Sequence, residues 1–311
     1  MKDEEEACAG GASVIAADGS PRSERHLWPP PFRNALGWRT IRFVESTIQL
    51  VAIDLDGTLL DQKKRVSPAV AEALCALPQR GVRVVIASAR PPRSVRAIYN
   101  ALKLDTWQIN YNGALIWDEP AQAVVHHAPL KPELVLSMVE RARDMFEEVA
   151  VSCEILDRWY TDRAEQMYMT ETGRLFRPDT VAPIEEFCRE PVTKLMMLGE
   201  APMISRLEQL LTPEYPKTNI VRAEPELLQV MSVKANKAIA LRRVAAHYGV
   251  AMENVMAIGD AANDIPMLQA VGVGVAMDNA HPLVKRIAKW VAPSNNDHGV
   301  HAALRKYGLC E

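Results

Sequence analysis

Two aspartates stand one residue apart at the end of a short apolar run, in the segment Val51 to Leu60 (VAIDLDGTLL). Residues 50 to 53 are apolar without alternation, which is typical of a strand buried on both faces of a parallel sheet. Asp54 and Asp56 would then follow the carboxyl end of this strand, where open α/β sheets bind their ligands. Residues i and i+2 of a strand point to the same side, so both carboxylates can face one site, and Gly57 allows a sharp turn beside them.

The same segment also fits an aspartate-rich turn after a core strand, and the residues alone leave this alternative open. A calcium loop that begins at Asp54 would need an acidic twelfth ligand, but that position is Arg65. Such a loop also follows a helix, whereas a strand is expected here. Two carboxylates this close repel each other unless a cation or a proton lies between them.

A second acidic cluster follows a later apolar run (VMAIGDAAND), in which Asp260 comes at the end of the strand and Asn263 and Asp264 open the next helix. Taken alone, this cluster also fits a helix cap. Taken with the first cluster, it predicts that Asp54 and Asp260 share one divalent cation with Asp56, whose backbone carbonyl can join them. Magnesium suits such a site because it takes one or two carboxylates and accepts substrate phosphate oxygens.

Two further residues are placed where an anionic substrate would need them. Ser88, in IASAR, ends a second predicted strand just before a helix, whose free N–H groups together with the hydroxyl can hold a phosphate oxygen. A serine that only caps the helix is the alternative. Lys237 opens a later helix and would supply the positive charge that a transferring phosphoryl group requires. Lys237 and the nearby Lys234 also fit solvated surface lysines.

The chain divides into segments of different character. Strands and helices alternate over residues 46–128 and again over 233–311, which is the pattern of a parallel sheet covered by helices on both faces. Residues 129–232 instead contain paired strands beside helices, which indicates an inserted α+β unit. Residues 1–45 are acidic, small and proline-containing, and we expect a disordered extension there.

The composition excludes several classes of protein. The formal net charge is -3 and the sequence pI is near 6.2, so there is no basic field for nucleic acid. The five cysteines are scattered without a C-x-x-C pair, which indicates reduced thiols in a cytosolic compartment. No apolar stretch approaches the roughly 20 residues that a membrane span needs. We therefore expect a cytoplasmic protein without nucleic-acid or membrane partners, either a monomer or a homodimer.

The motifs DLDGTLL, ASAR, NKAIAL and GDAANDIPML, in this order, resemble those of the haloacid dehalogenase (HAD) superfamily. The closest resemblance is to its Cof-like phosphatases with a large inserted α+β cap (subfamily IIB), and it runs from about residue 48 to the C-terminus. It implies the α/β class, with a three-layer αβα Rossmann-like core, a parallel sheet and a cap domain. It also implies a Mg²⁺-dependent phosphatase of small phosphorylated metabolites, sugar phosphates first, that works through an aspartyl-phosphate.

The resemblance further implies a role for each matching residue. Asp54 would be the nucleophile, and Asp56 would be the acid that protonates the leaving oxygen and then the base that activates water. For this chemistry Asp56 must begin protonated and Asp54 ionised, and we expect their proximity and the metal to separate their pKa values in that sense. The phosphoryl oxygens would be held by Ser88, Lys237 and Asn263. The metal would be held by Asp54, Asp56 and Asp260, with Asp264 orienting its shell. The mouth of the site would be lined by Asn112 and Gly113.

The sequence departs from the usual family pattern at a few positions. Relatives commonly have Thr-Gly at Ser88-Ala89, a glycine at Ala238 and a glutamate at Gln229. The serine keeps the hydroxyl group, so we expect activity to be retained.

The substrate is open at this stage, because the motifs address only the phosphoryl group. Alternatives are a pyridoxal phosphate or flavin mononucleotide phosphatase, a phosphosugar mutase of the same fold, and a non-enzymatic phosphoacceptor protein. The last is disfavoured because a phosphoacceptor domain is short and uninterrupted. Cap residues that could bind hydroxyl groups or stack on a ring, or simply pack at the surface, are Arg158, Trp159, Tyr160 and Arg163.

Overall fold

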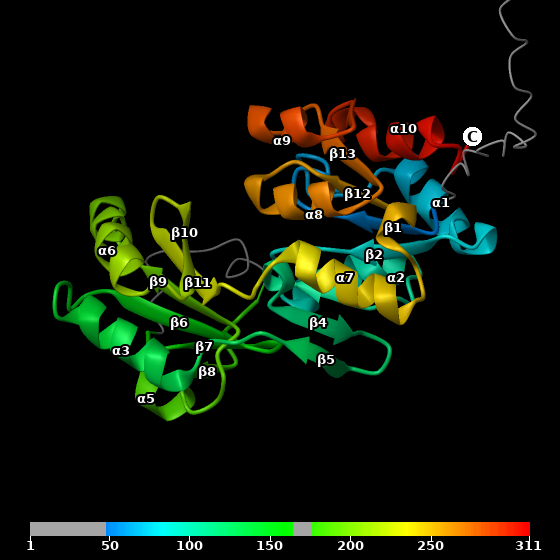
Figure 1. Ribbon diagram of the computed structural model, residues 1–311. Helices are drawn as coiled ribbons and strands as arrows, with labels where there is room; N and C mark the ends of the chain where they lie inside the picture. Colours follow the sequence, from blue (N-terminus) through cyan, green and yellow to red (C-terminus); the bar gives the residue numbers. More distant parts are fainter. Residues whose placement is uncertain (1–47, 164–175) are drawn as a thin grey trace, which may run out of the picture. The chain divides into compact units, whose positions relative to one another are not determined.

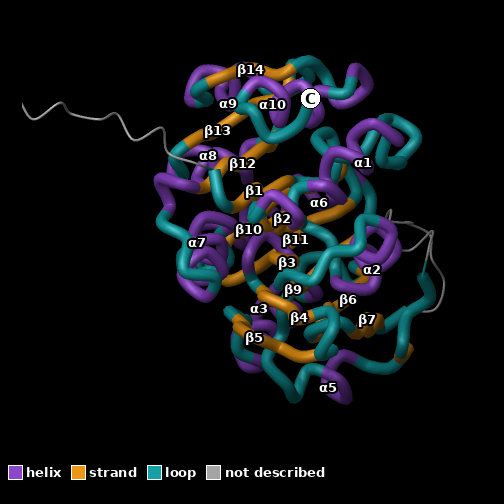
Figure 2. Tube along the Cα trace, turned by 90° about the vertical axis from the view of Figure 1, so that its right-hand side faces the viewer, coloured by secondary structure: helices purple, strands orange, loops and turns teal. Residues whose placement is uncertain are grey.

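The segments that carry the sequence motifs form a five-stranded parallel sheet. The computed structural model describes residues 48–163 and 176–311; the extension predicted over residues 1–45 lies outside them. The strands follow the order β14-β13-β12-β1-β2, which can be traced in Figure 2. Their bounds are β1 Leu50–Ile53, β2 Arg83–Ile86, β12 Val255–Gly259, β13 Val273–Met277 and β14 Trp290–Ala292.

Helices cover both faces of this sheet (Figure 1). Side chains of β1 alternate between the two faces: Val51 and Ile53 pack into one apolar cluster, and Leu50 and Ala52 pack into another. The first cluster includes side chains of α1 (Pro68–Ala76), α2 (Pro92–Ala101) and α10 (Gly299–Lys306). The second includes side chains of α7 (Lys237–His247), α8 (Ile265–Ala270) and α9 (Pro282–Ile287). The parallel sheet covered by helices on both faces, predicted from the alternation of strands and helices, is confirmed, as is the three-layer core that the family resemblance implied.

A small antiparallel sheet continues from the edge of the parallel one. Its strands are β3 (Gln108–Asn110), β4 (Leu115–Asp118) and β5 (Ala123–His127), and Ala87 forms a parallel bridge to Ile109. β4 and β5 form an antiparallel hairpin. A tight turn at Tyr111–Gly113 joins β3 to β4, and the N–H of Asn112 in this turn donates to the carbonyl of Ser88.

The segment between the two core regions forms a six-stranded sheet of its own, in the order β10-β11-β9-β6-β7-β8. Its strands are β6 Ala150–Ile155, β7 Arg158–Thr161, β8 Thr180–Val181, β9 Lys194–Leu198, β10 Thr218–Glu224 and β11 Leu227–Ser232. Helices α3 (Pro132–Arg143), α5 (Ile184–Phe187) and α6 (Ala201–Glu214) pack on one face. The short β8 and α5 were not predicted. The boundaries of a separate cap domain at residues 129 and 232 stay a prediction.

The register of the parallel sheet positions the two acidic clusters. β1 pairs with β12 so that Ile53 lies opposite Ile258, and Asp54 and Asp260 follow these residues at the same edge. In the described part of the chain, no helix has the length and apolar character that crossing a bilayer requires. The cysteines in that same part, Cys75, Cys153, Cys188 and Cys310, are all free thiols.

Candidate active site

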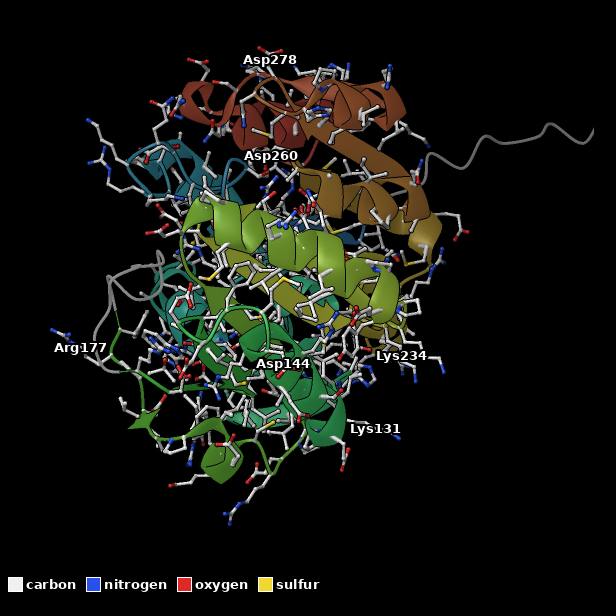
Figure 3. All side chains as sticks on the ribbon, turned by 90° about the vertical axis from the view of Figure 1, so that its left-hand side faces the viewer. Lys131, Asp144, Arg177, Lys234, Asp260 and Asp278 are labelled. Carbon is white, nitrogen blue, oxygen red and sulfur yellow. The ribbon has the colours of Figure 1, made fainter. Side chains whose placement is uncertain are left out.

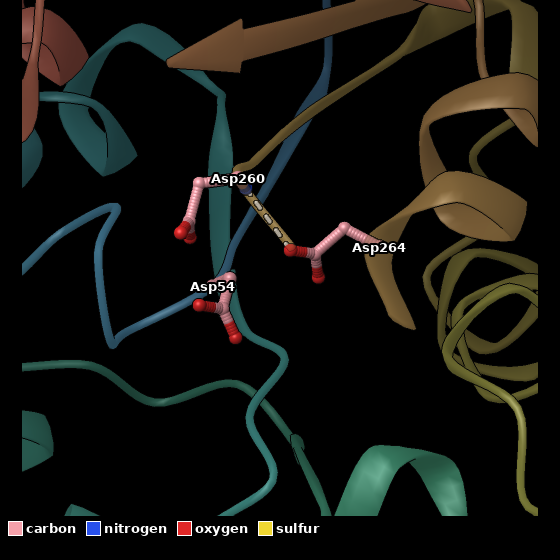
Figure 4. Close-up of side chains that lie close together, drawn as sticks. All are labelled: Asp54, Asp260 and Asp264. Carbon is pink, nitrogen blue, oxygen red and sulfur yellow. Dashed lines mark hydrogen bonds between the residues drawn. The ribbon is translucent and has the colours of Figure 1, made fainter. Parts of the chain in front are cut away.

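Three aspartates converge at the carboxyl edge of the parallel sheet. Asp54, Asp260 and Asp264 each have a carboxylate oxygen within 4.8 Å of the others (Figure 4). Oδ2 of Asp264 accepts hydrogen bonds from the backbone N–H groups of Asp260 and Ala261, both 3.0 Å long, so this carboxylate fixes the turn that carries Asp260. Burial raises the pKa of Asp54 to about 7 and that of Asp260 to about 6, because a crowded carboxylate away from water loses solvation.

Lys237 supplies a buried positive charge to this cluster. Its ammonium group donates to Oδ1 of Asp54 at 2.6 Å and to Oδ1 of Asp264 at 2.7 Å. Although burial opposes the charged form, the two carboxylates raise the pKa of Lys237, so it stays protonated. The first turn of α7 fixes its place, since Asn236 caps that helix through Ala238 N–H. Lys234, in contrast, is exposed and points away from the fold (Figure 3).

The carboxylate of Asp56 does not join the cluster of three. Arg90 holds it in a bidentate pair, with Nε 2.7 Å from Oδ2 and Nη2 2.6 Å from Oδ1. Lys64 donates to Oδ1 as well, at 2.7 Å. Burial opposes ionisation, but these hydrogen bonds lower the pKa of Asp56. The protein groups around them therefore place the pKa of Asp56 below that of Asp54, and the opposite order expected on metal binding stays a prediction.

A close approach explains the glycine of the first motif. Gly57 has φ +80, and its missing side chain leaves room for the carboxylate of Asp260. The hydroxyl of Thr58 donates to Oδ1 of that same carboxylate at 2.7 Å. The turn after β1 thus orients a side chain that follows β12, about 200 residues later in the chain.

Ser88 lies at the carboxyl edge as expected, but the helix after it does not offer free N–H groups. Ser88 is almost fully buried, and its hydroxyl oxygen accepts from the N–H of Arg90 at 3.2 Å. Helix α2 opens with two prolines, which have no N–H. The next amide, that of Arg93, donates to Oδ1 of Asp157 at 2.8 Å. The expectation that the helix amides hold phosphate is wrong for this amide; the hydroxyl of Ser88 remains the candidate.

Asn112 and Gly113 lie beside the site, where their contacts are with protein groups. The amide of Asn263 is exposed and donates to Oδ1 of Asn112 at 2.8 Å. Gly113 packs so closely against the start of α7 that an added Cβ would lie 3.0 Å from the backbone nitrogen of Lys237. The short turn therefore contacts two of the residues predicted to bind phosphate.

The aromatic residues proposed to read the substrate point to opposite faces of the inserted sheet. Tyr160 stacks on Phe187 with ring centroids 5.4 Å apart, on the face covered by the helices. Trp159 packs with Met196 on the other face, so the pair cannot bind one ligand together. Arg158 and Arg163 are exposed, and Arg163 donates to the carbonyl of Glu147.

Three residues of the site received no role from the sequence. Thr58 and Arg90 stand inside the quoted motifs, and their spacing from Asp56 and Ser88 could have identified them, since both follow strand ends at the same edge. Lys64 lies in a turn after the first motif, and no pattern in the sequence indicates that it returns to Asp56.

Comparison with known proteins agrees with this geometry. Residues 51–304 match the haloacid dehalogenase-like hydrolases. The chain is 31% identical over 269 residues to a putative phosphatase of Streptococcus pyogenes serotype M6. This match covers 85% of this chain and 99% of the relative. The chain is 28% identical over 268 residues to a 5-amino-6-(5-phospho-D-ribitylamino)uracil phosphatase of Bacillus subtilis (85% and 99% covered). It is 30% identical over 273 residues to a pyridoxal phosphate phosphatase of Escherichia coli (82% and 96%).

The fold has solved counterparts as well. A haloacid dehalogenase-like hydrolase from Bacteroides thetaiotaomicron superposes with a TM-score of 0.76 at 28% identity, covering 84% of this chain and 99% of that one. The chain therefore belongs to the haloacid dehalogenase-like hydrolases, in the Cof-like subfamily. It is a phosphatase, so the predicted family, fold class and reaction class are confirmed.

Proposed function

We propose that the protein is a Mg²⁺-dependent phosphohydrolase that removes phosphate from small phosphorylated metabolites, sugar phosphates first, through an aspartyl-phosphate on Asp54. The observation that supports this most directly is the grouping of Asp54, Asp260 and Asp264 around the buried ammonium group of Lys237. A phosphate monoester repels a carboxylate nucleophile, so a site for it needs fixed positive charge next to the attacking oxygen.

The donor set fits Mg²⁺. Carboxylate oxygens are hard ligands, and burial raises the pKa of Asp54 and of Asp260, so a divalent cation bound between them would stabilise their ionised forms. Asp264 is already paired with Lys237 and with two backbone amides, so we assign it to orienting the site. When bound, the metal would neutralise charge on the phosphoryl oxygens and on Asp54.

The residues of the chain itself would then carry out two chemical steps. A carboxylate oxygen of Asp54 bonds to phosphorus while the ester P–O bond breaks, and the leaving oxygen takes a proton from Asp56. A water molecule next attacks the phosphorus of the aspartyl-phosphate and gives its proton to Asp56, which releases inorganic phosphate and restores Asp54. Lys237, Ser88 and Asn263 would bind the phosphoryl oxygens throughout.

The contacts of Asp56 favour the second of these steps. As a base it must be ionised, and the hydrogen bonds from Arg90 and Lys64 stabilise that form. As an acid it must first take up a proton, which the same contacts oppose. We infer that the bidentate pair with Arg90 loosens before the first step, when a substrate occupies the site.

The relatives differ in the phosphate ester for which they are named. Two curated relatives of similar identity act on chemically different esters, a ribityl-amino-uracil phosphate and pyridoxal phosphate. Sequence identity near 30% therefore leaves the substrate open, and a pyridoxal phosphate, flavin-type or phosphosugar substrate each has a place in the screen. A phosphosugar mutase of the same fold would move the phosphoryl group without releasing it.

We propose Trp159 as the cap residue that contacts the leaving group. It is more than nine-tenths buried, and its indole N–H has no hydrogen-bond partner among the described residues. We expect Trp159→Ala to change kcat/KM among substrates by tenfold or more relative to a generic aryl phosphate. Tyr160→Ala, on the opposite face, should lower stability with little change in substrate preference.

The experiment is a screen for phosphate release from a panel of small phosphate esters, with the purified protein and its Asp54→Asn variant. We expect turnover on several esters, loss of turnover in a chelator, recovery on adding Mg²⁺, and none in Asp54→Asn. Full activity after exhaustive chelation would contradict the metal requirement, and steady turnover by Asp54→Asn would contradict the nucleophile. Activity confined to phosphopeptides would contradict the substrate class.

A further inference from the structure

The turn between β3 and β4 holds two consecutive residues in the left-handed region. Tyr111 has φ 48 and Asn112 has φ 55, and neither is a glycine. Such residues cost on the order of 1–3 kcal/mol each and persist only where the surroundings hold them in place. Tyr111 is fully buried, so the turn is held by its contacts.

Those contacts reach the residues assigned to phosphate and to Asp56. The N–H of Asn112 donates to the carbonyl of Ser88 at 3.0 Å, and the N–H of Tyr111 donates to the carbonyl of Arg90 at 3.4 Å. Gly113 packs against the first residues of α7, which carries Lys237. One three-residue turn therefore touches two segments of the site, the stretch from Ser88 to Arg90 after β2 and the start of α7.

The side chain of Asn112 contacts a third segment, the one that carries Asn263. Its Oδ1 accepts from the amide nitrogen of Asn263 at 2.8 Å. An amide nitrogen has two hydrogens, so the second stays available for a phosphoryl oxygen. The acceptor Asn112 also fixes which end of the Asn263 amide faces the site.

The side chain of Tyr111 points the other way, to the hairpin between β6 and β7. Its hydroxyl group bonds to the carbonyl of Leu156 at 2.8 Å and to Oε2 of Glu154 at 3.1 Å. Glu154 is itself held by Arg93 of α2, at 2.7 Å. Leu156 also has a left-handed backbone, φ 58, which places its carbonyl at the tip of the hairpin.

We propose that Asn112 is a positioning residue that holds Asn263 toward the phosphoryl group, and that Tyr111 anchors the same turn to the β6–β7 hairpin. The inserted unit and a phosphate-binding side chain are thereby coupled through one strained turn. This rests on the proposed function, since it takes Asn263 as a phosphate contact. It also reassigns Asn112, which the sequence suggested as a residue of the substrate-binding mouth.

The substitutions can be chosen to separate side-chain loss from backbone strain. Asn112→Gly removes the acceptor but suits a φ of 55, because glycine adopts that region freely. Lys103→Gly is the matched control, since Lys103 is exposed and has φ 53. Tyr111→Phe removes a buried hydroxyl group, and Tyr99→Phe is its control, because the hydroxyl of Tyr99 bonds to the carbonyl of Thr106 at 2.9 Å away from the turn.

The readout is competitive inhibition by inorganic phosphate during hydrolysis of p-nitrophenyl phosphate by the full chain. Asn263→Ala and Asn112→Gly should each raise the inhibition constant about tenfold, as expected for losing or misaiming one hydrogen bond to a charged group. The double variant should be no worse than Asn263→Ala alone, since Asn112 acts through Asn263. The Lys103→Gly control should leave the constant unchanged.

The tyrosine variants test the anchor in the same assay. Tyr111→Phe should raise the phosphate inhibition constant severalfold, and add nothing in the Asn112→Gly background, whereas Tyr99→Phe should lower only the melting temperature. If Asn263→Ala is impaired while Asn112→Gly matches the wild type, the positioning role is overturned and the proposed function stands. If Asn263→Ala binds phosphate normally, or the wild type hydrolyses no phosphate ester, the fault lies in the proposed function instead.

Discussion

Gly57→Ala tests how the turn after β1 shapes the proposed metal site. Gly57 has φ +80, and an added Cβ would lie 2.7 Å from Cγ and 2.9 Å from Oδ1 of Asp260, inside the 3.4 Å at which ordinary contacts begin. The carboxylate proposed to bind Mg²⁺ would have to move by most of an ångström or turn away. Gly81 is a matched control, because it has φ +75 and an added Cβ there would meet nothing within 4 Å.

Both variants should lose stability through backbone strain, but only Gly57→Ala should also lose activity. Alanine in the left-handed region costs about 1–2 kcal/mol, so both should lose that much free energy of unfolding and a few degrees of melting temperature. Only Gly57→Ala disturbs Asp260 and its hydrogen bond from Thr58. Misplacement by about 1 Å at a reacting centre can cost about 100-fold in rate, so kcat/KM should fall by about two orders of magnitude.

The assay is a Mg²⁺ titration of phosphatase activity for both variants and the wild type, alongside chemical unfolding. We expect the Mg²⁺ concentration for half-maximal activity to rise in Gly57→Ala and to stay at the wild-type value in Gly81→Ala. If Gly57→Ala keeps both its rate and its Mg²⁺ dependence, then Asp260 does not hold the metal in the geometry described. Equal loss of activity in both variants would point to backbone strain instead.

Three further predictions concern charge and the N-terminal segment. Burial raises the pKa of Asp54 to about 7 and of Asp260 to about 6, so protons compete with Mg²⁺ for these carboxylates. The half-saturating Mg²⁺ concentration should therefore fall as the pH rises from about 5.5 to about 7.5. A half-saturating concentration that does not depend on pH would contradict this. Lys237→Met leaves Asp54 and Asp264 without their buried cation and should lower the free energy of unfolding by about 3–5 kcal/mol, measured by urea titration; an unchanged midpoint would refute it. Deleting residues 1–44, which contain none of the motif residues, should leave melting temperature and turnover nearly unchanged, and a clear drop in either would show that the segment packs on the rest.

The strands and the main acidic residues could be predicted because their signals are local. β1 and β12 are buried on both faces, which requires an apolar residue at every position, and a polar residue directly after such a run must lie at the sheet edge. The positions of Asp54 and Asp260 follow from that rule. For Lys237 the residues alone left a surface lysine as the alternative, since its burial depends on partners that are distant in the sequence.

The sequence-based expectations fail where a group is already hydrogen-bonded to a residue outside its own motif. The amide of Arg93 is used by Asp157, and the carboxylate of Asp56 by Arg90 and Lys64. No local pattern shows that such a group is already occupied. The alternation of Trp159 and Tyr160 between faces was, in contrast, available from the strand period alone.

The place of β1 in the sheet has a consequence for synthesis of the chain. β1 lies between β2 and β12, and its pairing with β12 sets Leu50 opposite Val255. Because about 200 residues separate these positions, the β12-facing edge of β1 remains unpaired for roughly 10 to 40 s at about 5–20 residues per second. The strands β6 to β11 are contiguous in sequence and can pair during that time. A ribosome-bound chain therefore exposes an apolar strand edge until synthesis is almost complete, and variants that weaken β12 should aggregate during expression more than the stability of the finished protein would suggest.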